Sequence, residues 1–506
     1  MDRTQLTPKR LRGILAVMGI SLMAVISAVS GLNMAIPSIA DATGASLTEL
    51  QWIVDAYTVI FAGLLLIAGS IGDRFGRKGI LQFGLAVFAL AALAAMFTTD
   101  PQQLIIYRGV MGFAAACIMP TTLSVITTVF PPEQRGKAVG IWVGIAAGGG
   151  VIGLFAAALL LEWFEWNSFF GFNVTLALIA FIGATVIVPK NKETHPFPLD
   201  FFGGFLSLLT VGGLVFGFIE GPSRGWDDVW TVTSLIVGVV AGIVFVLWEL
   251  KREHPLLDPR LFKLRGFSAG SLSIFTQFFA AFGFFFVGMQ YLQFVAGLDP
   301  LQAAVCILPM PFVVIPLSRF TPVLAQKVGF RVTSPLGLSM MAAGFLVFTT
   351  LGVDLVYWQL LIGLLLFGGG MALAGPPATT AIVSSLPQQK QGVASAVNDV
   401  SREMASALGI AILGSVLNQM YTDNFLPSLA KLPVKAQEAL TSTIAWINND
   451  AALKKLGPLA EGLVTDAKEA YLSGVKGAFW IAAGVLVVGA IVIALRAPKN
   501  PAHTEK

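Results

Sequence analysis

The chain has 506 residues, of which 56% are hydrophobic and only 12% are charged, with a formal net charge of +4. Its mean hydropathy is +0.80, whereas about a quarter of the residues in an ordinary soluble domain are charged. This composition excludes a water-soluble domain and predicts an integral membrane protein.

Long apolar segments follow one another along the whole chain. A helix needs about 20 apolar residues to cross a hydrocarbon core of about 30 Å. The first segment is too long for the core of a signal peptide, so we expect it to remain as a helix. We predict fourteen transmembrane helices near residues 14–37, 50–71, 80–98, 103–128, 138–161, 168–189, 201–220, 231–249, 268–293, 301–318, 332–352, 357–383, 396–419 and 476–495.

The basic residues are distributed unequally between the two sides of these helices. If the N-terminus is cytoplasmic, the cytoplasmic segments hold most of the 32 basic residues and the short outer loops hold only Arg224. Cytoplasmic loops of membrane proteins carry such an excess. We therefore expect a multi-pass protein of the bacterial cytoplasmic membrane, with both termini in the cytoplasm. The basic residues serve this topology, so no nucleic-acid partner is expected.

One long outer loop, residues 421–474, carries charges of both signs. Long loops cross the membrane largely regardless of their charge, so this loop is compatible with the topology. Apolar residues recur at helical spacing in Pro433–Ile447 and in Pro458–Leu472, which predicts two amphipathic helices.

An internal repeat relates the two ends of the chain. The segment Gly69–Lys78 follows the second apolar run, and the similar segment Pro322–Arg331 follows the tenth. Arg135–Ala138 and Gln391–Ala394 form a second such pair at nearly the same separation. Two parallel six-helix halves with two additional helices between them explain both pairs. We thus expect an N-terminal bundle at 1–190, two additional helices at 191–266 and a C-terminal bundle at 267–506.

Several motifs resemble those of the major facilitator superfamily, and in particular its fourteen-helix drug:proton antiporters of the quaternary-ammonium-compound exporter type. The motifs are Gly69–Lys78, Gln51–Tyr57, Asn33-x-Ala35-x-Pro37, His254–Asp258 with Leu261-Phe262, Tyr291–Gln293 and Gly392–Arg402. The resemblance implies an all-α major facilitator fold. It also implies proton-coupled export of hydrophobic or amphipathic small molecules by alternating access, with protons and the small molecule as partners.

Three positions depart from the subfamily pattern. Ala28 stands where the subfamily usually has an aspartate in the first helix. Leu154 replaces a proline in the antiporter motif of the fifth helix, and Trp166-Asn167-Ser168 replaces Trp-Arg-Trp. These departures favour an alternative, a lipid or lipid-precursor translocase of the same fold. A non-transporting receptor or assembly factor is a further alternative, which the intact Gly69–Lys78 loop argues against.

Two charged residues lie inside predicted helices at similar depth. A charge in the membrane costs at least about 2.5 kcal/mol, so Asp55 and Arg108 should face the bundle interior or water. We expect Asp55 to bind the coupling proton and Arg108 to lower its pKa or relay the proton. In the alternative, the two form a structural ion pair or bond to the facing helix.

Further candidate residues follow from the family resemblance and from composition. The resemblance implies that the loop containing Gly69, Gly72, Asp73, Arg74, Gly76, Arg77 and Lys78 latches one conformation, although topology alone also favours such charges. Small residues every fourth position predict close helix packing at Gly140, Gly144, Gly148 and Gly153. Polar groups among aromatic residues give candidate cavity residues: Asn33, Gln277, Phe282, Gln290, Gln293 and Asn398. Asp399, Arg402 and Glu403 form a second charge network, structural or functional.

No cofactor or metal is expected. Cys117 and Cys306 lie in separate apolar runs and the three histidines lie in loops or the tail, so neither a disulfide framework nor a zinc site is indicated. The sequence has no nucleotide-binding loop. Glu220 and Glu249, at helix ends, are expected to be solvated. We expect a monomeric transporter in the lipid bilayer and no enzyme activity.

Overall fold

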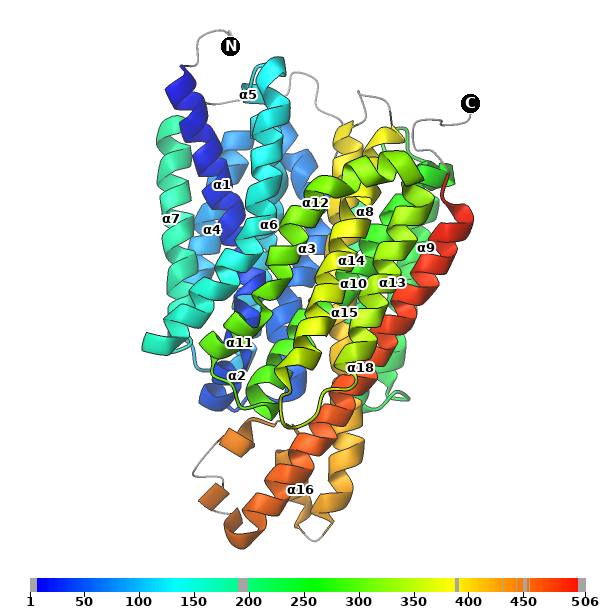
Figure 1. Cartoon of the computed structure of the whole chain (residues 1–506). Coiled ribbons are helices and arrows are strands. Elements are labelled where there is room, and N and C mark those ends of the chain that lie inside the picture. Colours follow the sequence, from blue (N-terminus) through cyan, green and yellow to red (C-terminus); the bar gives the residue numbers. More distant parts are fainter. Residues whose placement is uncertain are drawn as a thin grey trace.

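The computed structural model describes residues 7–189, 199–386, 391–430, 432–442, 444–448, 453–454 and 456–498. Within these ranges the chain forms helices, turns and no strands. The long helices run roughly parallel in one elongated bundle, and the smaller helical segments of the 421–474 region extend beyond one end (Figure 1).

The N-terminal bundle contains helices from the first part of the chain. α1 packs on α5, α6 and α7, and α5 also packs on α3 and α4. Their bounds are α1 (Pro8–Ser30), α2 (Leu32–Thr43), α3 (Leu47–Phe75), α4 (Arg77–Phe97), α5 (Pro101–Val129), α6 (Pro132–Trp163) and α7 (Ser168–Ile187).

The C-terminal bundle has equivalent packing, with α10 against α14, α15 and α18, and α13 against α14 and α18. The hairpin of α8 and α9 lies beside both bundles, because α8 contacts α3 and α15. The bounds are α8 (Phe201–Arg224), α9 (Val229–Glu249), α10 (Arg265–Gln290), α11 (Pro300–Ile307), α12 (Pro309–Val328), α13 (Phe330–Phe348), α14 (Tyr357–Ser384), α15 (Gln391–Phe425), α16 (Val434–Ser442) and α18 (Ala460–Arg496).

Twelve helical stretches of the described residues are long and apolar enough to cross a membrane. They comprise α1, α4, α5, α7, α8, α9, α10, the α11–α12 pair, α13, α14, α15 and α18. α3 and α6 are 29 and 32 residues long and pack in the same bundle, but several of their side chains lie outside the described part. The all-helical membrane fold is therefore confirmed, while the count of fourteen spans stays a prediction.

The internal repeat is visible in two matching turns. Gly76 separates α3 from α4 and Gly329 separates α12 from α13, with φ angles of +112° and +86°. Only glycine adopts such angles without strain. Two residues after each glycine, a basic side chain caps another helix. Lys78 Nζ donates to the carbonyl oxygens of Thr185 and Val188 at 2.8 Å, and Arg331 Nε donates to Ala494 at 2.5 Å.

Several predicted spans are interrupted. The run at 14–37 is divided at Gly31, the residue between α1 and α2, where an added Cβ would lie 2.5 Å from the Phe169 ring. The run at 301–318 breaks between Ile307 and Pro309, because proline lacks the N–H that would continue the ladder. The predicted 268–293 span ends in a π-helix, Tyr291–Val295.

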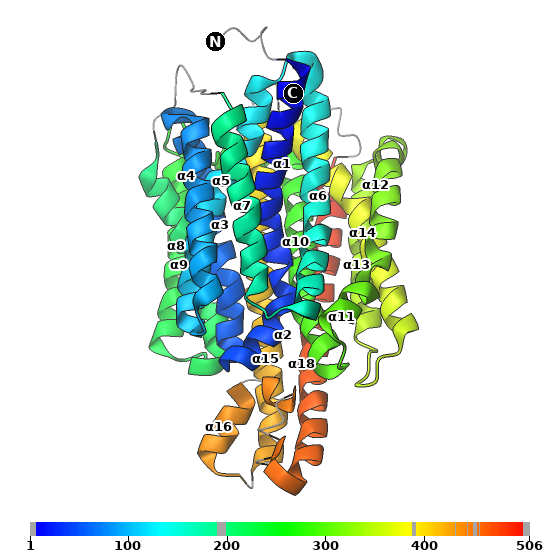
Figure 2. The ribbon, with the colours of Figure 1, turned by 90° about the vertical axis from the view of Figure 1, so that its left-hand side faces the viewer.

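The outer loop differs from its prediction in one respect. The first amphipathic segment forms α16, followed by a short 3-10 helix at Ala445–Asn448. The second segment is not a separate helix, since it is continuous with the last apolar run in the 37-residue α18. Its apolar positions Leu463 and Tyr471 are buried. Figure 2 shows α16 and the first part of α18 at the end opposite the start of α1.

If α6 crosses the membrane, residues at its two ends must be accessible from opposite sides. Gln134 and Glu165 are both exposed and are suitable for single-cysteine labelling in a background lacking Cys117 and Cys306. We expect Glu165→Cys to react with an impermeant maleimide in intact cells, and Gln134→Cys only after permeabilisation. Equal reactivity of both sites in intact cells would contradict the crossing.

Candidate functional site

Arg108 is fully buried and connects three helices of the N-terminal bundle. Its Nε donates to the carbonyl oxygen of Ile53 on α3 at 2.9 Å, and its Nη1 donates to that of Ala28 on α1 at 3.1 Å. The guanidinium also lies 4.4 Å from the centroid of the Tyr57 ring, a cation–π contact. The charge is thus held by two backbone dipoles and an aromatic face, and by no carboxylate within the described residues.

The neighbouring helices approach closely around this cation. A Cβ on Gly112 of α5 would overlap the carbonyl oxygen of Tyr57 on α3, so only glycine allows this contact. The Tyr57 hydroxyl donates to the carbonyl oxygen of Val25 on α1 at 2.9 Å. Sequence reasoning missed Tyr57 as part of the site, although it belongs to the same Gln51–Tyr57 motif as Asp55.

Asp55 is also fully buried, on α3. Its Oδ1 accepts a hydrogen bond from Thr58 Oγ1 at 2.8 Å, and its Oδ2 has no partner among the described residues. Asp55 and Arg108 thus lie on two packed helices, but each has its own contacts and they form no ion pair within 4.0 Å. The ion pair of the structural alternative is not present in this conformation, whereas bonds to the facing helices are: backbone carbonyl groups of α3 and α1 accept from Nε and Nη1 of Arg108, and its Nη2 has no hydrogen-bond partner among the described residues.

The second charge network lies on α15 and faces the N-terminal bundle. Arg402 Nε contacts Glu403 Oε1 at 3.1 Å, and its Nη2 lies 3.7 Å from Asp399 Oδ1. The same Nη2 donates to the sulfur of Met119 on α5 at 3.8 Å. The network therefore joins the two bundles, which sequence position alone did not indicate.

Aromatic side chains of α10 border this network. Phe278 lies 5.6 Å from the Arg402 guanidinium and stacks on Phe282 with centroids 6.1 Å apart. Nearby on the same helix, Gln277 Nε2 donates hydrogen bonds to the hydroxyl and carbonyl oxygens of Ser273. Asn398 accepts a hydrogen bond from Thr379 at 3.2 Å. Of the predicted cavity residues, Phe282 and Asn398 are thus brought closest to the Arg402 network.

The other predicted cavity residues lie elsewhere. Gln290 accepts a hydrogen bond from the Tyr471 hydroxyl at 2.9 Å, inside the C-terminal bundle, and so connects α10 to α18. Gln293 is buried in the π-helix and its Nε2 lacks a partner among the described residues. Asn33 on α2 donates to the Val29 carbonyl oxygen, and its Oδ1 is likewise unpartnered there. The predicted cavity residues therefore do not form one cluster.

The predicted latch loop and glycine run are described only in part. Gly72 lies within α3 rather than in a turn, and a Cβ there would approach Thr121 at 3.2 Å; one on Gly69 would approach Pro120 at 3.5 Å. Arg74 is exposed and Arg77 is buried, while the side chain of Asp73 lies outside the described residues. In the glycine run, Gly153 packs against Ser27 of α1 so closely that a Cβ would lie 2.5 Å from its Cα. The surroundings of Gly140, Gly144 and Gly148 are not described.

The two bundles also touch at the end from which α16 projects. Gln51 Nε2 of α3 donates to the carbonyl oxygen of Ala411 on α15 at 3.4 Å, and Asn418 of α15 donates to Thr48 at 3.3 Å. Nearby, α2 packs on α10 and α11 packs on α6. A cavity of about 780 Å³ lies outside these contacts, bordered by Trp52, Glu220 and α16. Glu220 is not simply solvated, because Trp52 Nε1 and Arg224 Nε both donate to it at 2.7 Å.

Comparison with known proteins agrees with this architecture. The family model described as Major Facilitator Superfamily matches residues 18–410. The chain belongs to the major facilitator superfamily. Members of this superfamily are transporters, so the chain is a transporter and not an enzyme.

Similar proteins include several named for drug resistance. The chain is 28% identical to the multidrug resistance protein Stp of Mycobacterium tuberculosis, over 96% of this chain and 91% of that protein. It is 29% identical to the multidrug efflux pump LfrA of Mycolicibacterium smegmatis, over 97% of each chain. It is 31% identical to the methyl viologen resistance protein SmvA of Salmonella typhimurium, over 77% of this chain and 79% of that protein.

Among solved structures, a bacterial homologue of the human lysosomal transporter Spinster in an inward-facing conformation superposes with a TM-score of 0.63. The sequence identity is 17%, over 97% of both chains. The peptide-transporter-family protein PepTSo superposes with a TM-score of 0.64 at 15% identity, over 97% of this chain and 98% of that one. At this identity the likeness concerns the fold alone.

We expect Arg108→Lys to destabilise the protein, because an ammonium lacks the planar fork that reaches Ile53 and Ala28 together. Leaving a buried acceptor unpaired costs about 1–3 kcal/mol. The melting temperature in detergent should fall well below that of the wild type, while Arg319→Lys, at an exposed site of α12, should leave it unchanged. Equal melting temperatures for both variants would show that the bridge does not hold the helices together.

Proposed function

We propose that the protein is a proton-coupled exporter of hydrophobic or amphipathic small molecules that works by alternating access. The observation that carries the proposal is the fully buried Asp55, whose Oδ2 has no partner among the described residues, in a transporter related to multidrug efflux proteins. A carboxylate without a cation partner at membrane depth is expensive when ionised. Binding a proton removes that charge, which makes Asp55 suited to carry the coupling proton.

The proposed cycle couples the proton to movement between the bundles. When the central space opens to the acidic side, Asp55 takes up a proton. When it opens to the other side, water reaches the carboxyl group and the proton leaves. Arg108 favours this release, because a cation on the adjacent helix stabilises the ionised form. The conformation described here has bundle contacts at Gln51–Ala411 and Thr48–Asn418, which we assign to the outer, closed side.

Glu403 is the second candidate for proton exchange. It is buried and contacts Arg402, which reaches Met119 of the N-terminal bundle. A change in its charge would act on both halves, whereas Arg402 already neutralises part of that charge at 3.1 Å. Asp55 has no such cation contact, so we assign the principal role to Asp55 and a modulating role to Glu403.

We further propose the fourteen-helix topology of the quaternary-ammonium exporter type. α3 and α6 are long enough to cross the membrane at 1.5 Å per residue. Adding them to the twelve apolar stretches gives fourteen crossings, an even number. Both termini would then be cytoplasmic, in the bacterial cytoplasmic membrane, and the unit of transport would be a monomer. The alternative of lipid or lipid-precursor translocation rests on Ala28 and Leu154, two of the three departures from the exporter pattern.

Asp55→Asn tests the coupling residue. An amide keeps the volume and the contact with Thr58 but cannot exchange the proton, so pH-gradient-driven uptake of a monocationic dye into proteoliposomes should fall to the level of protein-free liposomes. Asp423→Asn, which removes an exposed carboxylate of α15, should transport normally. Undiminished gradient-driven uptake by Asp55→Asn would assign coupling to another acid. Movement of a fluorescent phospholipid but not of the dye by the wild type would favour the lipid alternative.

The charge of the cargo can be tested at position 28. Two cationic charges in a buried site each need a compensating partner, and Ala28 removes one carboxylate of the subfamily pattern. We expect the wild type to confer resistance to monocationic amphiphiles but little to methyl viologen, a dication. Ala28→Asp should extend resistance to methyl viologen, and Ala28→Asn serves as its uncharged control. Strong wild-type resistance to methyl viologen would contradict this interpretation of the site.

A further inference from the structure

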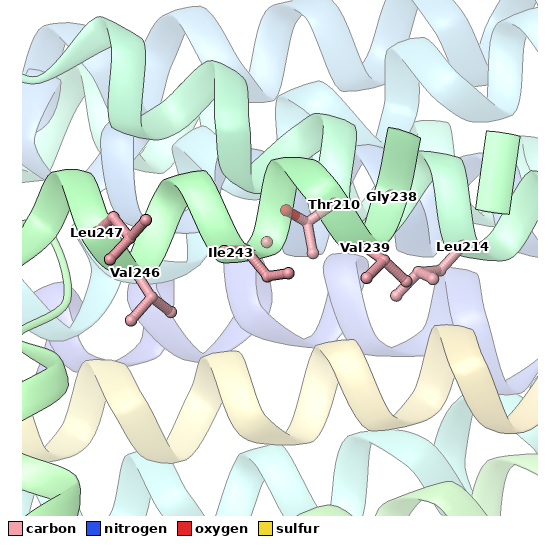
Figure 3. A pocket seen from close by; sticks show the side chains of 8 residues that line it. Thr210, Leu214, Gly238, Val239, Ile243, Val246 and Leu247 are labelled. Atoms are coloured by element: carbon pink, nitrogen blue, oxygen red, sulfur yellow. The ribbon is translucent and has the colours of Figure 1, made fainter. Parts of the chain in front are cut away.

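The additional hairpin formed by α8 and α9 carries an apolar groove that neither the coupling site nor the bundle interface uses. The groove has a volume of about 420 Å³ and is lined by Thr210, Leu214, Gly238, Val239, Gly242, Ile243, Val246 and Leu247. In Figure 3 the labelled side chains follow these two helices. α9 has the lowest buried share of the twelve apolar stretches, 17%, so the groove opens away from the protein core.

Glycines explain why the groove exists. α8 and α9 come together at Gly213 and Gly238, since a Cβ on Gly213 would lie 2.8 Å from the Gly238 nitrogen. One turn further along α9, Gly242 also lacks a side chain, whereas Val239 and Ile243 project on either side of it. The groove therefore lies between the two helices and follows the second half of α9 toward Leu247.

Two basic residues follow α9 in the sequence. Lys251 is exposed and lies in the turn after α9, four residues beyond Leu247. The next residue, Arg252, is positioned by the protein: its Nε lies 3.2 Å from Asp200 Oδ2, and its guanidinium lies 5.2 Å from the Trp248 ring centroid. Asp200 is buried and also accepts a hydrogen bond from Trp248 Nε1 at 2.8 Å.

These contacts hold the Arg252 side chain at Nε and leave its two Nη nitrogens available. Neither Nη nitrogen has a hydrogen-bond partner in the part of the chain that the structure describes, and the side chain is 38% exposed. A guanidinium presents its Nη groups as a fork that fits phosphate oxygens. The pair of Phe202 and Trp248, with centroids 4.8 Å apart, borders the region between the groove and this fork, at the depth where aromatic rings favour the membrane interface.

We propose that this groove binds an anionic phospholipid of the leaflet that contains Lys251, which the charge distribution assigns to the cytoplasmic side. One acyl chain lies between α8 and α9, and the phosphate contacts Lys251 and the Nη groups of Arg252. The apolar lining excludes a polar solute from the groove, and the basic end selects a negatively charged headgroup over a zwitterionic one. Three acidic groups lie near these basic residues: Asp200 pairs with the Nε side of Arg252, Glu249 accepts from the Leu256 N–H, and Glu253 is exposed beside Arg252.

The test is thermal stabilisation of the detergent-purified protein by added phosphatidylglycerol, compared with phosphatidylcholine of identical acyl chains. The concentration that stabilises the wild type should be lower for phosphatidylglycerol than for phosphatidylcholine. Lys251→Gln, which leaves the Asp200 contact intact, should raise the phosphatidylglycerol midpoint about fivefold, the effect of one basic residue at an anionic surface. Lys251→Gln with Arg252→Gln should remove the preference between the two lipids.

Two further variants separate the headgroup from the groove. Gly242→Leu fills the groove while requiring only a small shift of Thr210, since a Cβ at 242 would lie 3.1 Å from its methyl group. It should weaken stabilisation by both lipids. Arg319→Gln with Lys327→Gln removes two exposed basic residues of α12 and should retain the wild-type preference.

Four results would overturn the proposal. The wild type could show equal midpoints for the two lipids, or the α12 control could lose the preference. Gly242→Leu could respond to both lipids as the wild type does. Copies carrying Val239→Cys could form a disulfide with each other in membranes. The last result would assign the groove to a second copy of the chain.

Discussion

The burial of one guanidinium group constrains the N-terminal half of this transporter. Arg108 is completely enclosed, and its charge at membrane depth is tolerable only where polar groups surround it. The carbonyl oxygens of Ala28 and Ile53 supply them, together with the Tyr57 ring. Because these groups belong to α1 and α3, the three helices keep one relative arrangement, and Asp55 is held beside them.

The same contacts involve position 28, where the chain has alanine in place of the aspartate of the exporter pattern. The side chain of Ala28 provides no carboxylate, but its backbone oxygen binds Arg108 at 3.1 Å. Two of the three guanidinium nitrogens are therefore hydrogen-bonded without any acid, and within the described part of the chain both Arg108 Nη2 and Asp55 Oδ2 lack a partner. In the C-terminal half the charges are organised differently, since Arg402 contacts two acids of its own helix and reaches Met119 of the other bundle. The first arrangement stabilises one half, and the second connects the two halves.

Hydropathy predicted most of the helical architecture, because span length is a property of short segments. The repeat also predicted a real correspondence: Gly76 and Gly329 both adopt positive φ, and Lys78 and Arg331 both cap the last helix of their bundle. The break at Gly31 was not predicted, because an apolar run continues through it. The prediction separated residues 458–472 from the final span because this segment is amphipathic, whereas the structure has one continuous helix, α18.

The candidate site was less predictable than the fold. Depth along each helix located Asp55 and Arg108 correctly in the interior, but their partners are backbone carbonyl groups, which no residue pattern specifies. Glu249 was expected in solvent and is fully buried, because the segment around Leu256 folds back over it. The position of Arg402 against Met119 depends on how two bundles meet, which is a property of the whole chain.

The most direct test of proton-coupled export is to record proton movement itself. Purified wild-type protein would be reconstituted into liposomes that contain a pH-sensitive dye, with no initial pH gradient. A gradient of a monocationic substrate would then be imposed across the membrane. The account predicts a pH change inside the vesicles, opposite in direction to substrate movement, that a proton ionophore abolishes. Substrate movement at the same rate with no change in internal pH would contradict it.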